Sequence, residues 1–168
     1  MKKNIVLIGM PAVGKSTVGV ILAKLLGYEF IDTDILIQKK EEKLLREIIA
    51  EKGVDGFIRL ENCIVSELRA SNAVIATGGS VVYGEDAMRN LSAGNIVVYL
   101  RLDYNKLKYR LKNLENRGVL IRDGQSLKAL YDERAPLYEK YAGIVIDTDN
   151  CGVEKTVSRI MAETERSL

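Results

Sequence analysis

The sequence predicts an α/β protein: a three-layer α/β/α fold built on a five-stranded parallel sheet. Short apolar runs alternate with amphipathic stretches along the chain, and glycine-rich or acidic residues directly follow several of the apolar runs. This alternation is typical of strands buried on both faces and joined by right-handed helical crossovers. At 168 residues the chain is long enough for one domain with a proper core. We therefore expect residues 1–168 to form a single domain.

The first half of the chain begins with an apolar, β-branched run at residues 5–8, which reads as a central strand. Apolar residues with helical spacing follow over residues 18–26, and Gly27 is expected to end this helix. A short strand is expected at residues 28–31. The other elements expected here are short helices at 35–38 and 44–50, a break at Gly53, and a longer helix capped by Asp55.

The second half of the chain repeats the alternation. Strands are expected at 73–76, 95–100 and 143–146. Helices are expected at 86–91, from Asp103 to about 114, at 127–132, from Glu133 onward with Pro136 in its first turn, and at 153–163. Residues 115–126 are polar and contain two glycines and two arginines, so we expect a mobile lid there.

A phosphate-binding loop follows the first strand. The segment GMPAVGKS, which begins at Gly9, fits the pattern G-x-x-x-x-G-K-S/T without a mismatch and leads directly into a helix. In such a loop the backbone N–H groups surround a polyphosphate at a helix N-terminus, where the helix dipole favours negative charge. Lys15 would reach the terminal phosphates of ATP, and Ser16 would offer its hydroxyl to Mg²⁺. The expected nucleotide-binding residues are Gly9, Ala12, Val13, Gly14, Lys15, Ser16 and Thr17.

Two further loops are expected at the same edge of the sheet. Asp32 and Asp34 follow the second strand, and Gly78 and Gly79 follow the third. In a phosphoryl-transfer reading Asp32 holds Mg²⁺ through its waters, and Asp34 orients or deprotonates an acceptor hydroxyl. Residues two apart on an extended strand point the same way, so these two aspartates could share one site if the strand continues that far. The chain has no histidine, which leaves a carboxylate as the expected base.

Composition sets limits on partners and location. The formal net charge is +2, which gives no global drive toward nucleic acid or anionic membranes. The apolar run near the N-terminus is too short for a signal peptide or a membrane span. The two cysteines are far apart in the sequence and are expected to be reduced thiols. We therefore expect a cytoplasmic monomer that acts on a small molecule.

The sequence resembles the shikimate kinase family over nearly the whole chain. GMPAVGKSTVG followed by FIDTD resembles the family's opening, and TGGS resembles its TGGG substrate loop, which ends here in Ser80. ERAPLYEKYA resembles its R-x-P-L-Y segment, which implies that Arg134 grips the carboxylate of shikimate. Arg110 falls where the family stacks an arginine on adenine, and Arg117 where its lid arginine meets the transferred phosphate. The resemblance implies ATP- and Mg²⁺-dependent formation of shikimate 3-phosphate in aromatic amino acid biosynthesis.

The chain departs from the family pattern around the acceptor. Where the family has F-R-x-x-E, Ile58 replaces an arginine that binds the substrate carboxylate, and Arg59 lies one residue along, roughly 100° around a helix. A lid residue or Arg59 could hold the carboxylate beside Arg134. Two alternatives therefore remain at this stage: a kinase of the same build that acts on a different hydroxylated metabolite, and a nucleotide-binding module without catalysis.

Overall fold

The structure, a computed structural model, describes residues 3–112 and 119–165. Its five strands form one parallel sheet in the order β2-β3-β1-β4-β5. The predicted α/β fold class is therefore confirmed. The strands are β1 (Ile5–Ile8), β2 (Glu29–Asp32), β3 (Ala73–Ala76), β4 (Ile96–Arg101) and β5 (Ile144–Asp147).

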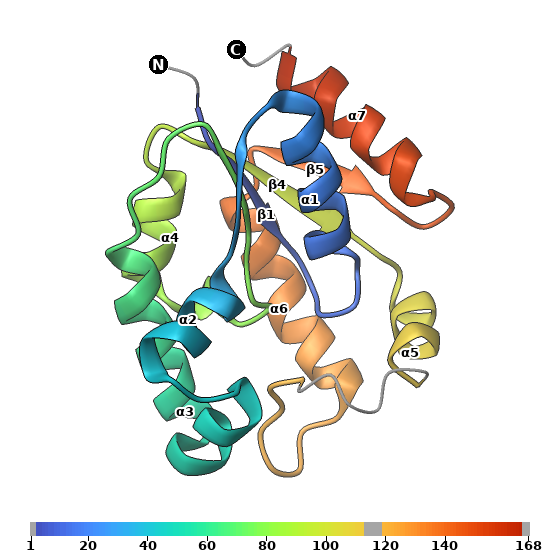
Figure 1. Cartoon of the computed structure of the whole chain (residues 1–168). Helices are drawn as coiled ribbons and strands as arrows, with labels where there is room; N and C mark the ends of the chain where they lie inside the picture. The colour runs from blue at the N-terminus through green and yellow to red at the C-terminus, as the bar shows by residue number, and fades with distance from the viewer. Residues whose placement is uncertain (1–2, 113–118, 166–168) are drawn as a thin grey trace.

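Helices cover both faces of the sheet (Figure 1). On one face α1 (Lys15–Leu26) packs beside α7 (Val153–Glu165). On the other face lie α3 (Leu45–Ser66), α4 (Glu85–Ser92) and α6 (Leu127–Tyr141). The remaining elements are α2 (Thr33–Glu41), the 3₁₀ turn η1 (Val81–Tyr83) and α5 (Tyr104–Lys112). None of the helices within residues 3–112 and 119–165 is both long and apolar enough to cross a membrane.

The apolar residues form two clusters. The larger one lies on both faces of the sheet and includes all of β1, whose residues are at most 4% exposed. The smaller one joins α2, α3 and the segment 119–126, because Leu120 packs among residues of these helices. We call it the α2/α3 cluster; its buried members are Ile37, Ile48, Phe57, Ile64 and Leu120.

One expected helix boundary is wrong. Residues 127–132 and the segment from Glu133 belong to one helix, α6, with Pro136 inside it. The buried positions Leu130, Arg134 and Tyr138 are spaced by four residues, so one packed face continues past the proline and outweighs its local cost. In α3, by contrast, the expected break is present: Gly53 has non-helical geometry, with φ 68° and ψ 179°, so two helical stretches meet at a kink there. The cap expected at Asp55 stays a prediction.

Gly9, at the end of β1, fits a position that a side chain cannot occupy. Its φ is +144°, and a Cβ there would lie 2.7 Å from the carbonyl oxygen of Leu100 on β4. Gly94 also has positive φ, at +72°, but nothing lies within 4 Å of where its Cβ would be. Substitutions at these two glycines can therefore distinguish the free-energy cost of a positive φ from the cost of a steric clash.

We expect Gly9→Ala to lower the free energy of unfolding by about 2–4 kcal/mol, because it adds a backbone clash to an unfavourable φ. Gly94→Ala, the matched control, should cost only about 1 kcal/mol. Urea denaturation followed by circular dichroism measures both values. Equal losses would show that the contact with Leu100 relaxes without cost.

Candidate active site

The phosphate-binding loop connects β1 to α1 and places Lys15 at the centre of a ring of backbone groups. Gly14, in left-handed conformation, caps α1, so its missing side chain leaves the first N–H groups of the helix accessible. The Lys15 ammonium donates hydrogen bonds to the carbonyls of Gly9 (2.7 Å) and Met10 (2.8 Å), and the residue is 7% exposed. A buried cation beside a helix N-terminus is suited to a polyphosphate.

Asp32 lies against the phosphate-binding loop. The Ser16 hydroxyl donates to its Oδ2 at 2.8 Å, and its Oδ1 accepts from the backbone N–H groups of Asp34 (3.0 Å) and Ile35 (3.4 Å). The hydroxyl and carboxylate are hard oxygen donors, of the kind Mg²⁺ takes from proteins alongside phosphate and water. Within residues 3–112 and 119–165, no group of three or more His, Cys, Asp or Glu side chains is arranged so that it could hold a metal ion.

The condition under which Asp32 and Asp34 would point the same way, a strand that continues to residue 34, is not met. β2 ends at Asp32, and Asp34 lies in the first turn of α2, which Asp32 caps. The Asp32 side chain accepts hydrogen bonds from the backbone N–H groups of Asp34 and Ile35, which a longer strand would use for pairing, and the chain therefore turns into a helix. The two carboxylates therefore serve different places: Asp32 contacts Ser16, whereas Asp34 reaches toward Gly78.

Gly78 leaves room for two carboxylates. A Cβ at this position would lie 2.8 Å from Oδ1 of Asp34 and 2.6 Å from Oε1 of Glu61. Burial, together with the negative charge of Asp32, raises the pKa of Asp34 to about 6, although Lys15 opposes the change. Asp34 is therefore an anion near pH 7 but a far better proton acceptor than an ordinary aspartate.

Glu61 on α3 is a site residue that the sequence reasoning missed. It is 1% exposed; its Oε2 accepts a 2.5 Å hydrogen bond from the Ser80 hydroxyl, and its Oε1 has no partner among the residues the structure describes. Burial raises the pKa of Glu61 to about 7. A signal was available, because Glu61 lies on the same helical stripe as the buried Phe57 and Ile64.

Arg134 is fixed by the surrounding backbone and aromatic groups. The residue is 1% exposed, and Nη2 donates to the carbonyl of Leu120 at 2.9 Å. Nε donates to the hydroxyl of Tyr83 at 3.3 Å, and the guanidinium lies over that ring. Nη1 would lie 3.1 Å from a Cβ on Gly79, so the glycine opens the approach to this group. The guanidinium is thus held ready for an anion.

A cleft of about 420 Å³ brings these groups together. One part of its wall is polar, and another is apolar and comes mainly from the α2/α3 cluster, through Ile49, Phe57 and Leu120. The predicted site residues that line it are Ala12, Gly14, Lys15, Ser16, Thr17, Asp34, Gly78, Gly79, Ser80 and Arg134. Arg46, which the sequence reasoning did not single out, also lines it.

Other predicted residues lie elsewhere. Gly9 and Val13 support the loop from behind, and Asp32 contacts Ser16 without lining the cleft. Arg110 on α5 donates to the carbonyls of Ala12 and Val13, both at 3.4 Å, so it lies on the outer side of the phosphate-binding loop. Arg117 lies outside the described residues.

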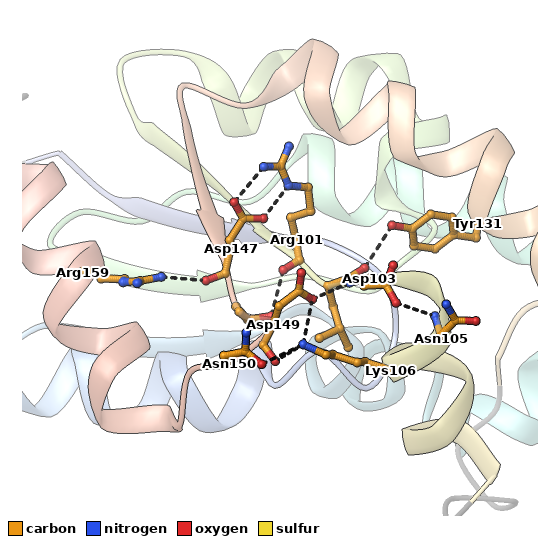
Figure 2. Close-up of polar contacts among 11 residues, drawn as sticks. Arg101, Asp103, Asn105, Lys106, Tyr131, Asp147, Asp149, Asn150 and Arg159 are labelled. Carbon is orange, nitrogen blue, oxygen red and sulfur yellow. Dashed lines mark hydrogen bonds and ion pairs between the residues drawn. The ribbon is translucent and has the colours of Figure 1, made fainter.

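A polar network anchors the helix that carries Arg110 (Figure 2). Asp103 caps α5 by accepting from the N–H of Asn105 at 2.9 Å. Lys106 donates to the carbonyl of Asp149 and to the side chain of Asn150, which follow β5. The carboxyl ends of β4 and β5 thereby hold α5 beside the loop.

These features define a P-loop phosphotransferase, in which the phosphate-binding loop and the carboxylate of Asp34 line one cleft. A family model of shikimate kinase matches residues 11–165. A shikimate kinase from Thermodesulfovibrio yellowstonii is 36% identical over 98% of this chain and 96% of its own length. The shikimate kinase of Acinetobacter baumannii, solved in complex with shikimate, has a TM-score of 0.88 and 32% identity, covering 98% of this chain and 94% of that one.

The chain therefore belongs to the shikimate kinase family. A shikimate kinase from Clostridium botulinum, 38% identical over 88% of this chain and 89% of its own length, agrees with this assignment. The activity of the family is ATP- and Mg²⁺-dependent phosphorylation of a hydroxyl of shikimate. Of the three readings that the sequence left open, shikimate phosphorylation is therefore the one supported.

Glu61 makes stability depend on pH. Its carboxyl faces Ser80, Asp34, Arg134 and Lys15, and its pKa rises from 4.5 to about 7 on folding. Because the folded state binds the proton more tightly, this group's stabilising contribution is complete below pH 4.5 and is lost as pH rises toward 7.

We expect Glu61→Gln to gain stability relative to the natural protein as pH rises from 4.5 to 8, by about 3 kcal/mol in total. The amide keeps an oxygen for the Ser80 hydroxyl but has no charge to bury. Urea denaturation at several pH values measures the difference. A constant difference across this range would contradict the raised pKa.

Proposed function

We propose that Asp34 is the base that accepts the proton of the shikimate hydroxyl, and that this chain phosphorylates shikimate through the cleft between Asp34 and Lys15. The position of Asp34 carries the proposal: its side chain lies beside Gly78 in the cleft that the phosphate-binding loop also lines. Its raised pKa, about 6, suits a proton acceptor that must be ionised near neutral pH.

The other proposed roles follow from the local chemistry. Lys15 and the N–H groups of the first turn of α1 bind the terminal phosphates and stabilise the charge that develops on them. Ser16 and Asp32 hold the Mg²⁺ ion, which neutralises phosphate charge when it is bound. Arg134 pairs with the carboxylate of shikimate, which its burial and the position of its Nη1 beside Gly79 support.

The apolar wall of the cleft supports a cyclic acceptor. Ile49, Phe57 and Leu120 present hydrocarbon surface opposite the polar groups. A ring with hydroxyls on one edge and a carboxylate on another would bury its carbon face against them. The backbone of Gly78 and Gly79, with Ser80, would then meet the polar edges.

The lid at 115–126 and the roles of Arg117 and Arg110 remain predictions. Within the described part of this segment, Arg122 forms ion pairs with Asp55 on α3 (3.1 Å) and Glu133 on α6 (3.4 Å). Leu120 is buried in the α2/α3 cluster. We propose that the segment closes the cleft by exchanging such contacts, excluding water that would otherwise hydrolyse ATP.

We further propose that the protein acts as a cytoplasmic monomer that binds neither nucleic acid nor membranes. The near-neutral balance of 25 basic and 23 acidic residues supports this. Cys63 and Cys151 are free thiols, as expected in a reducing compartment.

We expect Asp34→Asn to lower kcat with shikimate by about 10²–10⁴-fold, the usual contribution of a general base. The variant should fold normally at pH 7.5, because it removes a buried charge whose burial is unfavourable. A coupled assay of ADP release measures kcat, and isothermal titration measures ATP binding.

ATP affinity in Asp34→Asn should stay within a few fold of the natural protein, since Asp34 meets the acceptor and not the nucleotide. Turnover near the natural level would remove Asp34 as the base. Natural protein that turns over ATP without forming a phosphorylated acid would refute the proposed reaction itself.

A further inference from the structure

The cation missing at position 58 is not replaced by the neighbouring arginine. Ile58 packs against the α2/α3 cluster and does not line the cleft. Arg59 is exposed and does not line it either; its guanidinium lies 3.9 Å from where a Cβ on Gly56 would be. Within residues 3–112 and 119–165, the cleft is lined by only three cationic side chains: Lys15, Arg46 and Arg134.

Of these three side chains, Arg46 is the one without a partner among the residues that the structure describes. It is the second residue of α3 and is exposed, and it forms no hydrogen bond or ion pair with any residue that the structure describes. Arg134, by contrast, donates hydrogen bonds from Nη2 to the carbonyl of Leu120 and from Nε to the hydroxyl of Tyr83. Lys15 belongs to the phosphate-binding loop. Arg46 therefore keeps its whole guanidinium for a ligand in the cleft.

We propose that Arg46 supplies the second positive charge for the carboxylate of the acceptor, in place of the arginine absent at position 58. The proposal rests on the proposed function, because it assigns a residue to the acceptor of that reaction. Arg46 is then a specificity-determining residue: it selects an acid over an uncharged polyol and takes no part in the transfer step.

The carboxylate of the acceptor can accept more hydrogen bonds than Arg134 alone can donate. A carboxylate has two oxygens with about four acceptor sites, and Arg134 has already committed two of its nitrogens to the protein. The first turn of α3 borders the cleft through Leu44, Leu45 and Arg46. The Glu47 carboxylate in the same turn already accepts a hydrogen bond from the backbone N–H of Leu44 at 2.8 Å, so the positive charge available to an anion there is the guanidinium of Arg46.

The test compares Arg46→Ala and Arg46→Lys with Arg59→Ala, a control that removes the same charge from the same helix outside the cleft. KM and kcat are measured with shikimate and with its methyl ester, which keeps the hydroxyls and lacks the negative charge. We expect Arg46→Ala to raise the KM for shikimate about three- to tenfold with kcat unchanged, and Arg46→Lys to recover most of the loss. The KM for the ester should not change.

The salt dependence gives a second readout. The effect of Arg46→Ala on the KM for shikimate should shrink near 1 M salt, where charges are screened within about 3 Å. An unchanged KM for shikimate, an equal rise for acid and ester, or an equal rise in Arg59→Ala would overturn the role of Arg46. If the natural protein does not phosphorylate shikimate at all, the proposed function fails first, and the two failures are thus distinguished.

Discussion

The parallel pairing of β3 between β1 and β2 is the constraint on which the cleft depends. In this register Leu7, Ala76 and Asp32 lie in one row across the sheet. The phosphate-binding loop, the TGGS loop and the turn into α2 all begin within two residues of that row. Three segments distant in sequence therefore leave the sheet at one edge, and the hydrogen bonds between the strands fix the points at which they leave it.

The cleft concentrates charge that would be unfavourable without ligands. Asp34 and Glu61 both approach Gly78, and burial raises the pKa of each. Lys15 and Arg134 offset this only in part, since both are also buried. Such a site gives up folding stability to hold groups ready for phosphate, hydroxyl and carboxylate. The hydrogen bond from Ser80 to Glu61 shows how this chain relieves part of the conflict, with a hydroxyl at the third glycine position of the loop.

Local pattern was enough to predict the sheet, the phosphate-binding loop and the polar residues at the strand ends. The orientation of Asp34 was not predictable, because it depends on Asp32 ending β2 and capping α2. Arg46 and Glu61 depend on how α3 lies across the cleft, which the bend at Gly53 and packing on α4 determine. Long-range packing of this kind leaves a weak local signal: a glutamate on an apolar stripe, an arginine in a first helical turn.

Ile58, which stands where the family has an arginine, links specificity for the acceptor to the packing of the segment 119–126. Ile58 packs against the α2/α3 cluster, which includes Leu120, and the carbonyl of Leu120 accepts a hydrogen bond from Arg134. An apolar residue at 58 therefore adds to the cluster that holds Leu120, and the Leu120 backbone in turn holds Arg134. Of the two guanidinium groups that line the cleft among the described residues, Arg134 is buried against Leu120, and Arg46, on the first turn of α3, is the one proposed to meet the remaining charge of the acceptor. The proposed acceptor site combines a rigid, buried guanidinium with an exposed one, so we expect affinity for the acid to depend on ionic strength more than it would with two buried arginines.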